Sequence, residues 1–216
     1  MRTFAALFLL SAPCFAQACN APVCLVDPDS LSLTQIITFE DVHSGAGPGR
    51  HVDDVLPLPG ATFGERFAGQ SVSSRGPHDD IIGTAFAPLT MMPGAKGENL
   101  SVVNFAGQTV INGYGAAGFP RRDGQGEGAI AALFDTDQSA FAFDLRGGEA
   151  GAATVMMFRR DGSAIGQVPV KPTGEFSVGF LRSTGEADIA GFIVTNTDPQ
   201  GLAIDTLRFG KPPDLS

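Results

Sequence analysis

Apolar residues along this chain recur with a period of two, which differs from the 3.6-residue period of a helix. The alternation is clearest in Phe141-Ala-Phe-Asp-Leu145 and in Leu207-Arg-Phe209. Such a pattern places every second side chain on the same face of a β-strand. Arg160-Asp-Gly-Ser163 is typical of a hairpin, because Asp-Gly tolerates the positive φ that tight turns need. No segment has the pattern of an amphipathic helix, so the sequence predicts an all-β fold.

About eleven short runs of β-forming residues recur at the spacing of strands in a sandwich. The 28 glycines and 15 prolines suit short strands joined by turns. We therefore predict an antiparallel β-sandwich of the jelly-roll type over residues 34–210. Segments 41–60, 69–80 and 113–128 lack the alternation and are predicted to be long loops. The expected strand runs are Thr34–Glu40, Ala61–Phe67, Gly83–Pro88, Leu100–Phe105, Ala129–Phe134, Ser139–Leu145, Ala152–Arg159, Ala164–Val170, Gly174–Leu181, Asp188–Asn196 and Leu202–Phe209.

The first 18 residues have the pattern of a secretory signal peptide. Met1-Arg2 supplies one positive charge, an apolar run follows from Phe4 to Leu10, and small residues end at Ala16-Gln-Ala18. These three features predict cleavage after Ala18. The apolar run is shorter than the roughly 20 residues that span a bilayer, so we predict no transmembrane segment. The mature protein is expected to be secreted or periplasmic.

Two cysteines follow the predicted cleavage site. Cys19 and Cys24 lie in an N-terminal arm, residues 19–33, and in an oxidising compartment they predict a disulfide. The alternative is lipidation of Cys19. A bacterial lipobox usually has Leu three residues before its cysteine, and Ala16 stands there in this chain. A polar tail, residues 211–216, follows the domain.

The balance of charge argues against one class of partner. The chain has a formal net charge of −9, and removal of Arg2 with the signal peptide makes the mature protein more acidic. An acidic surface repels phosphate backbones, so we expect no nucleic-acid partner. Carboxylates attract divalent cations instead.

Short motifs in a particular order carry a resemblance to a known group of proteins. Ile37-Thr-Phe-Glu-Asp41 opens the domain and Ala203-Ile-Asp-Thr-Leu-Arg-Phe-Gly210 closes it. Between them lie Gly60-Ala-Thr-Phe-Gly64, Ser139-Ala-Phe-Ala-Phe-Asp144 and Phe158-Arg-Arg-Asp-Gly162. This order resembles exported bacterial β-sandwich proteins related to galactose-binding-like and carbohydrate-binding-module jelly rolls. The resemblance covers roughly residues 34–210 and implies carbohydrate-binding ancestry.

The same resemblance implies a structural calcium between neighbouring first and last strands, at Glu40 and Asp205. Strand parity places Asp205 on the side of Leu207 and Phe209, so a regular strand would turn it toward the core. A buried carboxylate needs a partner or a metal, and calcium prefers oxygen ligands. Parity favours Asp41 over Glu40 on the first strand, and both stay candidates. The alternative is that Asp205 only accepts backbone hydrogen bonds.

A weaker second calcium site is predicted at Asp135 and Asp137. Asp135-Thr-Asp-Gln-Ser139 resembles the start of a calcium loop. Ala140 and Arg146 stand where an EF-hand has Gly and Glu, so a turn between strands is the alternative.

Candidate ligand-binding residues are Tyr114 and Asn112, in Asn112-Gly-Tyr-Gly115. Carbohydrate-binding modules usually hold sugars with exposed Trp or Tyr, and this chain has no Trp and one Tyr. Ordinary packing is the alternative role for Tyr114. Gly113-Tyr-Gly-Ala-Ala-Gly118 matches a dinucleotide-binding pattern, but Phe119-Pro120 follows where a helix should run.

The sequence contains only weak indications of a catalytic site. His51-Val-Asp-Asp54 and His78-Asp-Asp80 could build a hydrolytic metal centre, although solvated loop charges explain them better. Glu98 and Glu127 are candidates for paired-carboxylate glycosidase chemistry, which depends on a separation that sequence does not show. No G-x-S-x-G motif occurs.

The sequence as a whole favours a non-catalytic, extracytoplasmic binding module for a cell-surface or extracellular polysaccharide, with calcium expected to stabilise it. One alternative is a structural or adhesive component of the envelope or matrix that binds protein. The other is a polysaccharide-active metal-dependent enzyme.

Overall fold

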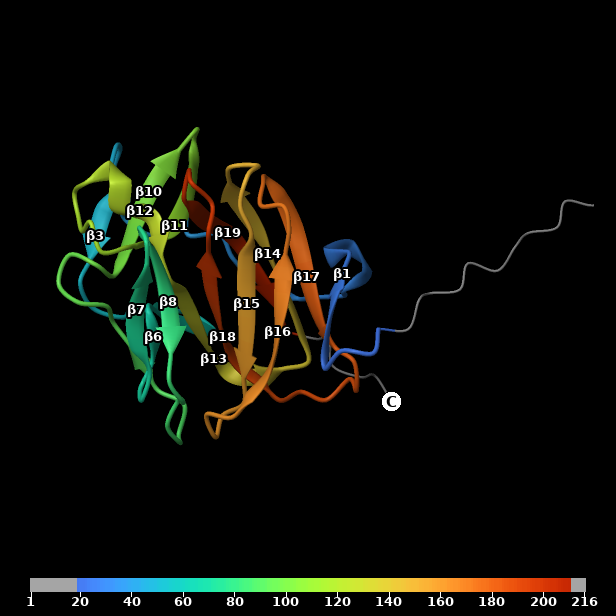
Figure 1. Cartoon of the computed structure of the whole chain (residues 1–216). Helices are drawn as coiled ribbons and strands as arrows, with labels where there is room; N and C mark the ends of the chain where they lie inside the picture. The colour runs from blue at the N-terminus through green and yellow to red at the C-terminus, as the bar shows by residue number, and fades with distance from the viewer. Residues whose placement is uncertain (1–18, 211–216) are drawn as a thin grey trace, which may run out of the picture.

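Strands make up most of the chain in the computed structural model, which describes residues 19–210 (Figure 1). The predicted signal peptide, residues 1–18, and the predicted tail, residues 211–216, lie outside the described residues. The helical segments in residues 19–210 are two short 3-10 turns, η1 (Pro28–Ser30) and η2 (Arg122–Gly124). Within this range no helix is long and apolar enough to cross a membrane. The nineteen strands are β1 (Val23–Val26), β2 (Gln35–Ile37), β3 (Arg50–Val52), β4 (Leu56–Leu58), β5 (Ala61–Gly64), β6 (Arg66–Phe67), β7 (Ser71–Arg75), β8 (His78–Ile82), β9 (Met91–Met92), β10 (Leu100–Phe105), β11 (Gln108–Tyr114), β12 (Gln125–Gly128), β13 (Ile130–Gln138), β14 (Ala140–Gly147), β15 (Ala153–Phe158), β16 (Ala164–Val170), β17 (Phe176–Arg182), β18 (Ile189–Asn196) and β19 (Leu202–Phe209).

The prediction of an all-β antiparallel sandwich is confirmed, with more strands than the expected eleven. Five of the additional strands, β3, β4, β7, β8 and β12, lie wholly or mostly in the segments predicted as loops. They are short, and their residues do not alternate between apolar and polar types. The predicted run Gly83–Pro88 forms no strand.

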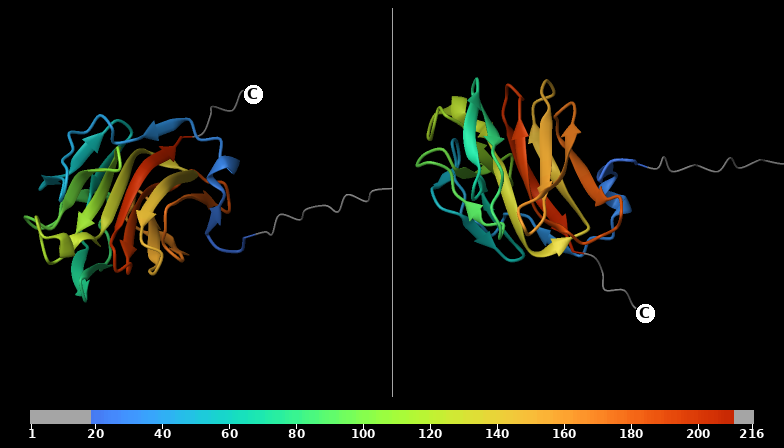
Figure 2. Two further views of the ribbon diagram at one scale, coloured as in Figure 1. Left: turned by 90° about the horizontal axis from the view of Figure 1, so that it is seen from above. Right: turned by 60° about the horizontal axis from the view of Figure 1, so that its bottom comes forward.

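Two large sheets make the sandwich (Figure 2). The nine-stranded sheet has the order β1-β17-β14-β19-β11-β10-β3, with β12 beside β11 and β2 beside β19. The six-stranded sheet has the order β16-β15-β18-β13-β5-β4. From β13 to β19 the chain passes repeatedly from one sheet to the other, as in a jelly roll. The pairing of β2 with β19 brings the first and last strands of the domain together, as the resemblance implies.

Phenylalanine rings fill the space between the two sheets. Phe141 on β14 stacks on Phe180 of β17, with ring centroids 4.9 Å apart, and on Phe192 of β18, with centroids 4.6 Å apart. The alternation that predicted β14 therefore places Phe141, Phe143 and Leu145 in the core. Such aromatic pairs add about 0.5–1.5 kcal/mol beyond the burial of their area.

A smaller outer layer covers the other face of the six-stranded sheet. Phe67, Met91, Phe158 and Ile193 belong to a second apolar cluster, which joins that sheet to the β6–β9 pair. The β7–β8 hairpin lies beside it, with β8 in contact with β18 and β12. Because both of its faces are covered, β18 is buried along nearly its whole length.

A β-bulge interrupts β19 at Thr206, whose φ is 46°. Ala142 pairs with Arg208 and Asp144 pairs with Asp205, so β19 has one residue more than β14 across this interval. The extra residue allows Ile204, Leu207 and Phe209 all to enter the core, although a regular strand could not bury all three on one face. Asp205 consequently lies on the outer face, which corrects the expectation that it points toward the core.

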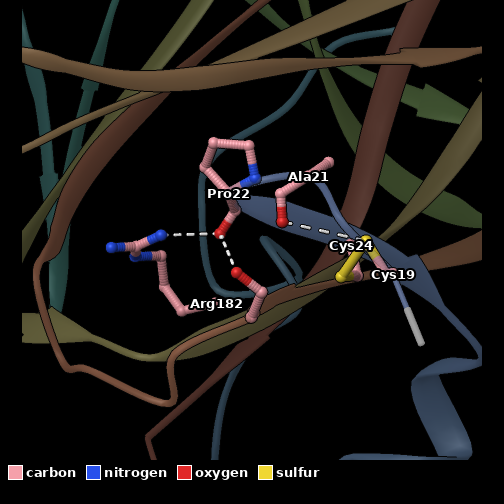
Figure 3. The surroundings of a disulfide bond; sticks show 6 residues. Cys19, Ala21, Pro22, Cys24 and Arg182 are labelled. Carbon is pink, nitrogen blue, oxygen red and sulfur yellow. Dashed lines mark hydrogen bonds between the residues drawn. A yellow bond between two sulfur atoms is a disulfide. The ribbon is translucent and has the colours of Figure 1, made fainter.

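The predicted disulfide between Cys19 and Cys24 is present (Figure 3). The arm that contains it continues into β1, which pairs with β17 at the edge of the nine-stranded sheet. The carbonyl oxygen of Pro22 accepts hydrogen bonds from Arg182 Nη1 at 2.6 Å and from Ser183 Oγ at 3.2 Å. The disulfide therefore closes a loop on an arm that is itself part of the sheet.

Truncation of the Phe141 ring tests its contribution to the core. Phe141→Ala is expected to lower the free energy of unfolding by about 3–5 kcal/mol, because it removes a fully buried ring and leaves a cavity. Urea denaturation measures the change. Phe86→Ala is the control, since Phe86 is 64% exposed, and its effect should stay within about 0.5 kcal/mol. Equal losses in the two variants would contradict the central role of Phe141.

Candidate functional site

A groove of about 560 Å³ lies on the outer face of the nine-stranded sheet. Ile111 on β11 faces the core, so its neighbours Val110 and Asn112 face outward. The lining comes from five strands and from the loops at one end of the sandwich. Its principal side chains are Asn104 and Phe105 of β10, Val110 and Asn112 of β11, Gln125 of β12, Arg146 of β14, Ala203 of β19, and Arg122, Glu175 and Gln200 of the neighbouring turns and loops.

Strand register aligns three of these residues in one row across the groove. Arg146 pairs with Ala203, and Ala203 pairs with Asn112 on its other side. Adjacent strands lie about 4.8 Å apart, so Arg146 and Asn112 have their Cα atoms on the order of 10 Å apart. The small side chain of Ala203 leaves space between them. This row is the floor of the groove.

Asn112 is the residue of this row whose side-chain carbonyl lacks a hydrogen-bond donor. Its side chain is 3% exposed, and its Oδ1 has no hydrogen-bond partner in the structure of residues 19–210. A buried acceptor without a donor is costly, and native proteins leave few such atoms. A ligand group that donates a hydrogen bond would remove this cost. The structure thus places Asn112, a candidate from the sequence, in a groove.

Tyr114, the other candidate, is fully buried. Its ring packs against Phe119, with centroids 5.5 Å apart, and against His51, with centroids 6.1 Å apart. His51 in turn stacks on Phe119 at 4.8 Å. The expectation of an exposed platform is corrected, since the loop that follows β11 covers the ring. Tyr114 supports this end of the sheet by packing.

Two of the three candidate calcium ligands, Asp205 and Glu40, contact hydrogen-bond donors of the protein itself. Asp205 is 3% exposed, and its Oδ2 lies 3.5 Å from Arg146 Nη2. Glu40 is exposed and accepts hydrogen bonds from Thr109, at 2.8 Å from its backbone nitrogen and 3.0 Å from its hydroxyl. Asp41 is exposed in the turn after β2.

The weaker calcium candidates, Asp135 and Asp137, also have partners within the protein. Asp135 Oδ2 accepts a hydrogen bond from the Gly60 nitrogen at 3.2 Å, and Asp137 pairs with Arg160. Among residues 19–210, no group of three or more His, Cys, Asp or Glu side chains could hold a metal. Calcium stays a prediction of the resemblance. A melting temperature that rises with added calcium and falls in EDTA would support it.

The histidines of the two motifs have different partners. His51 Nε2 lies 2.8 Å from Asp53 Oδ1. Asp53 also accepts a hydrogen bond from the Gly97 backbone, which is the main cause that lowers the pKa of its carboxyl. His78, on β8, lies instead against Glu127 of β12.

Buried carboxyl groups on β8 and on the adjoining β12 are a feature that the sequence pattern mostly did not indicate. Asp79 is 4% exposed and Glu127 is 6% exposed. Burial, then the charge of Glu65, raises the pKa of Asp79 to about 7. Burial, then the charge of Asp198, raises the pKa of Glu127 to about 7. Glu127 was a candidate carboxylate in the sequence, but the motif around Asp79 has the composition of a solvated turn.

No protein-family model matches this chain, and no curated protein has a significantly similar sequence.

The buried carboxyls predict a dependence of stability on pH. The folded-state pKa values of Asp79 and Glu127, about 7, lie above their ordinary values of 3.8 and 4.5, so the folded protein holds these protons more tightly. The free energy of unfolding should fall as the pH rises from about 4 to about 7, and this loss should level off above pH 7. Urea denaturation at pH 5 and pH 8 measures the difference.

Substitutions test whether these two carboxyl groups cause the pH dependence of stability. Asp79→Asn and Glu127→Gln should each reduce the loss of stability between pH 5 and pH 8. Glu149→Gln removes an exposed carboxylate and should leave that loss as it is in the wild type. If all three variants retain the same pH dependence, the two buried carboxyls are not its source.

Proposed function

We propose that this protein is an extracytoplasmic, non-catalytic module that binds a glycan chain in the groove of the nine-stranded sheet. The observation that carries the proposal is Asn112, a nearly buried side chain on the groove floor whose Oδ1 has no partner in the described structure. Sugar hydroxyls both donate and accept hydrogen bonds. One of them supplies the donor that Oδ1 lacks.

The rest of the lining suits the same kind of ligand. Asn104, Gln125 and Gln200 carry amides, each of which offers a carbonyl acceptor and an NH₂ donor. Phe105 is 55% exposed and adds an apolar surface for the C–H face of a sugar ring. Binding sites commonly combine apolar surface with a few polar groups that fix orientation. Ala203 leaves the floor open.

The disulfide supports the extracytoplasmic part of the proposal. Disulfides persist in oxidising compartments and are rare in the cytosol. The Cys19–Cys24 bond is compatible with export, and the signal peptide at residues 1–18 is the independent prediction that favours it.

Each alternative has one observation in its favour. An adhesive, protein-binding role is favoured by exposed apolar side chains outside the groove, among them Phe86 at 64% and Ile36 at 59% exposed. An enzymatic role is favoured by Asp79 and Glu127, whose carboxyls titrate near neutral pH. Both carboxyls are buried and neither lines the groove, so the binding role has the better support.

Binding of residues 19–216 to a panel of polysaccharides tests the proposal. We expect at least one polysaccharide to bind, and Asn112→Ala to weaken that binding about tenfold, because the ligand then loses a hydrogen bond to a buried group. Ala203→Leu should weaken binding further, since its larger side chain fills the floor of the groove while facing away from the core. Affinity electrophoresis and calorimetry measure these changes.

Substitutions at two exposed positions, one in the groove and one outside it, complete the test. Gln200→Ala removes an amide at the groove and should weaken binding without affecting folding, because Gln200 is exposed in a loop. Phe86→Ala lies outside the groove and should leave binding unchanged. Absence of binding across the panel would discard the glycan role and favour a protein partner. Binding that survives both Asn112→Ala and Ala203→Leu would place the ligand elsewhere.

A further inference from the structure

The charges of the groove differ from those of the whole chain. The protein has a formal net charge of −9, yet two arginines, Arg122 and Arg146, and one acidic residue, Glu175, line the groove. An anion approaching the molecule at random meets a repulsive surface. Within this groove it meets guanidinium groups.

Arg122 and Arg146 differ in how far their charges are already compensated. Arg146 Nη2 donates a hydrogen bond to Gln108 Oε1 at 2.8 Å and lies 3.5 Å from Asp205 Oδ2. Arg122 is exposed, and no salt bridge to it occurs within residues 19–210. A guanidinium offers five N–H donors in a planar fork, so both side chains retain donors for a ligand.

The sheet order separates Glu175 from Arg122. Glu175 precedes β17, whereas Arg122 belongs to η2, next to β12 and therefore on the β11 side of the groove. The order β17-β14-β19-β11 puts three strand spacings, about 15 Å, between the two sides. The groove thus has Arg122 and Asn112 on its β11 side and Glu175 on its β17 side, with Arg146 of β14 between them.

We infer that the groove selects an anionic glycan, one that carries carboxylate or sulfate groups, and that Arg122 holds the anionic group beside Asn112. This inference rests on the proposed function, because it names the class of glycan that the same groove takes. Arginine pairs with carboxylates and sulfates through two parallel hydrogen bonds, which gives selectivity as well as affinity. The hydroxyls of the same sugar reach Asn112 and the amides around it.

The test compares polysaccharides that share a backbone and differ in charge. Polygalacturonate is paired with its methyl-esterified form, and dextran sulfate is paired with dextran. We expect at least one charged member to bind about tenfold more tightly than its neutral partner at low salt, with the advantage shrinking as the ionic strength rises. The pair that shows the larger difference tells whether carboxylate or sulfate is the preferred group.

Substitutions of single arginines test whether Arg122 causes the preference for the charged glycan. Arg122→Gln should lower the affinity for the charged member about tenfold and leave the neutral member unchanged. Arg121→Gln is the matched control, because Arg121 is the adjacent exposed arginine and does not line the groove. Its Nη2 lies 3.5 Å from Asp123 Oδ2. Glu175→Gln should strengthen binding of the charged member, since it removes the negative charge from the groove. All three positions are at the surface, so the variants are expected to fold.

The outcomes separate this inference from the proposed function. If neutral and charged members bind equally well and Ala203→Leu weakens both, the glycan role stands and the anionic selectivity is overturned. If Arg121→Gln weakens charged glycans as much as Arg122→Gln does, general attraction replaces a specific site and the inference fails. If no polysaccharide of either kind binds, the proposed function itself fails.

Discussion

The β-bulge at Thr206 is the constraint on which the arrangement of the nine-stranded sheet depends. Strand β19 lies between β14 and β11 and must supply the core with Ile204 and Phe209 on the two sides of the bulge. One added residue turns the strand, so that core packing continues while Asp205 and Ala203 face outward. The same irregularity therefore completes the apolar interior and shapes the floor of the groove. A regular strand would turn the Asp205 carboxylate toward the apolar core or lose one of its apolar contacts there.

The alternation of apolar residues was sufficient to predict the main sandwich. It works for β14, because one face of that strand meets the core and the other is more polar. The alternation is absent where both faces are covered, as at Ala131 and Ile193, since the outer layer makes each side apolar. There the β-forming composition of the runs predicted the strands instead. The prediction fails for β3, β4 and β12, because strands of three or four residues are too short for an alternation to be recognised. The number of strands was underestimated because such short strands were predicted as loops.

The candidate site was predictable only in part. Asn112 was chosen together with Tyr114 because both stand in one glycine-rich segment, yet the structure places the first in a groove and buries the second. The difference depends on where the segment after β11 folds, which brings Phe119 and His51 over the tyrosine ring. Arg122 has no distinguishing pattern in the sequence. Its position beside the groove follows from the pairing of β12 with β11.

The outer layer over the six-stranded sheet has a consequence for solubility. Strand β18 contains Ile189-Ala-Gly-Phe-Ile-Val194, an uncharged segment without proline and with high β-propensity, which is the composition of segments that assemble into amyloid. In the folded protein β13 and β15 pair with both of its edges. The core and the outer layer cover its two faces. The β6–β9 pair and the β7–β8 hairpin thus protect one face of β18, and loosening them would expose this aggregation-prone segment before the sandwich itself unfolds.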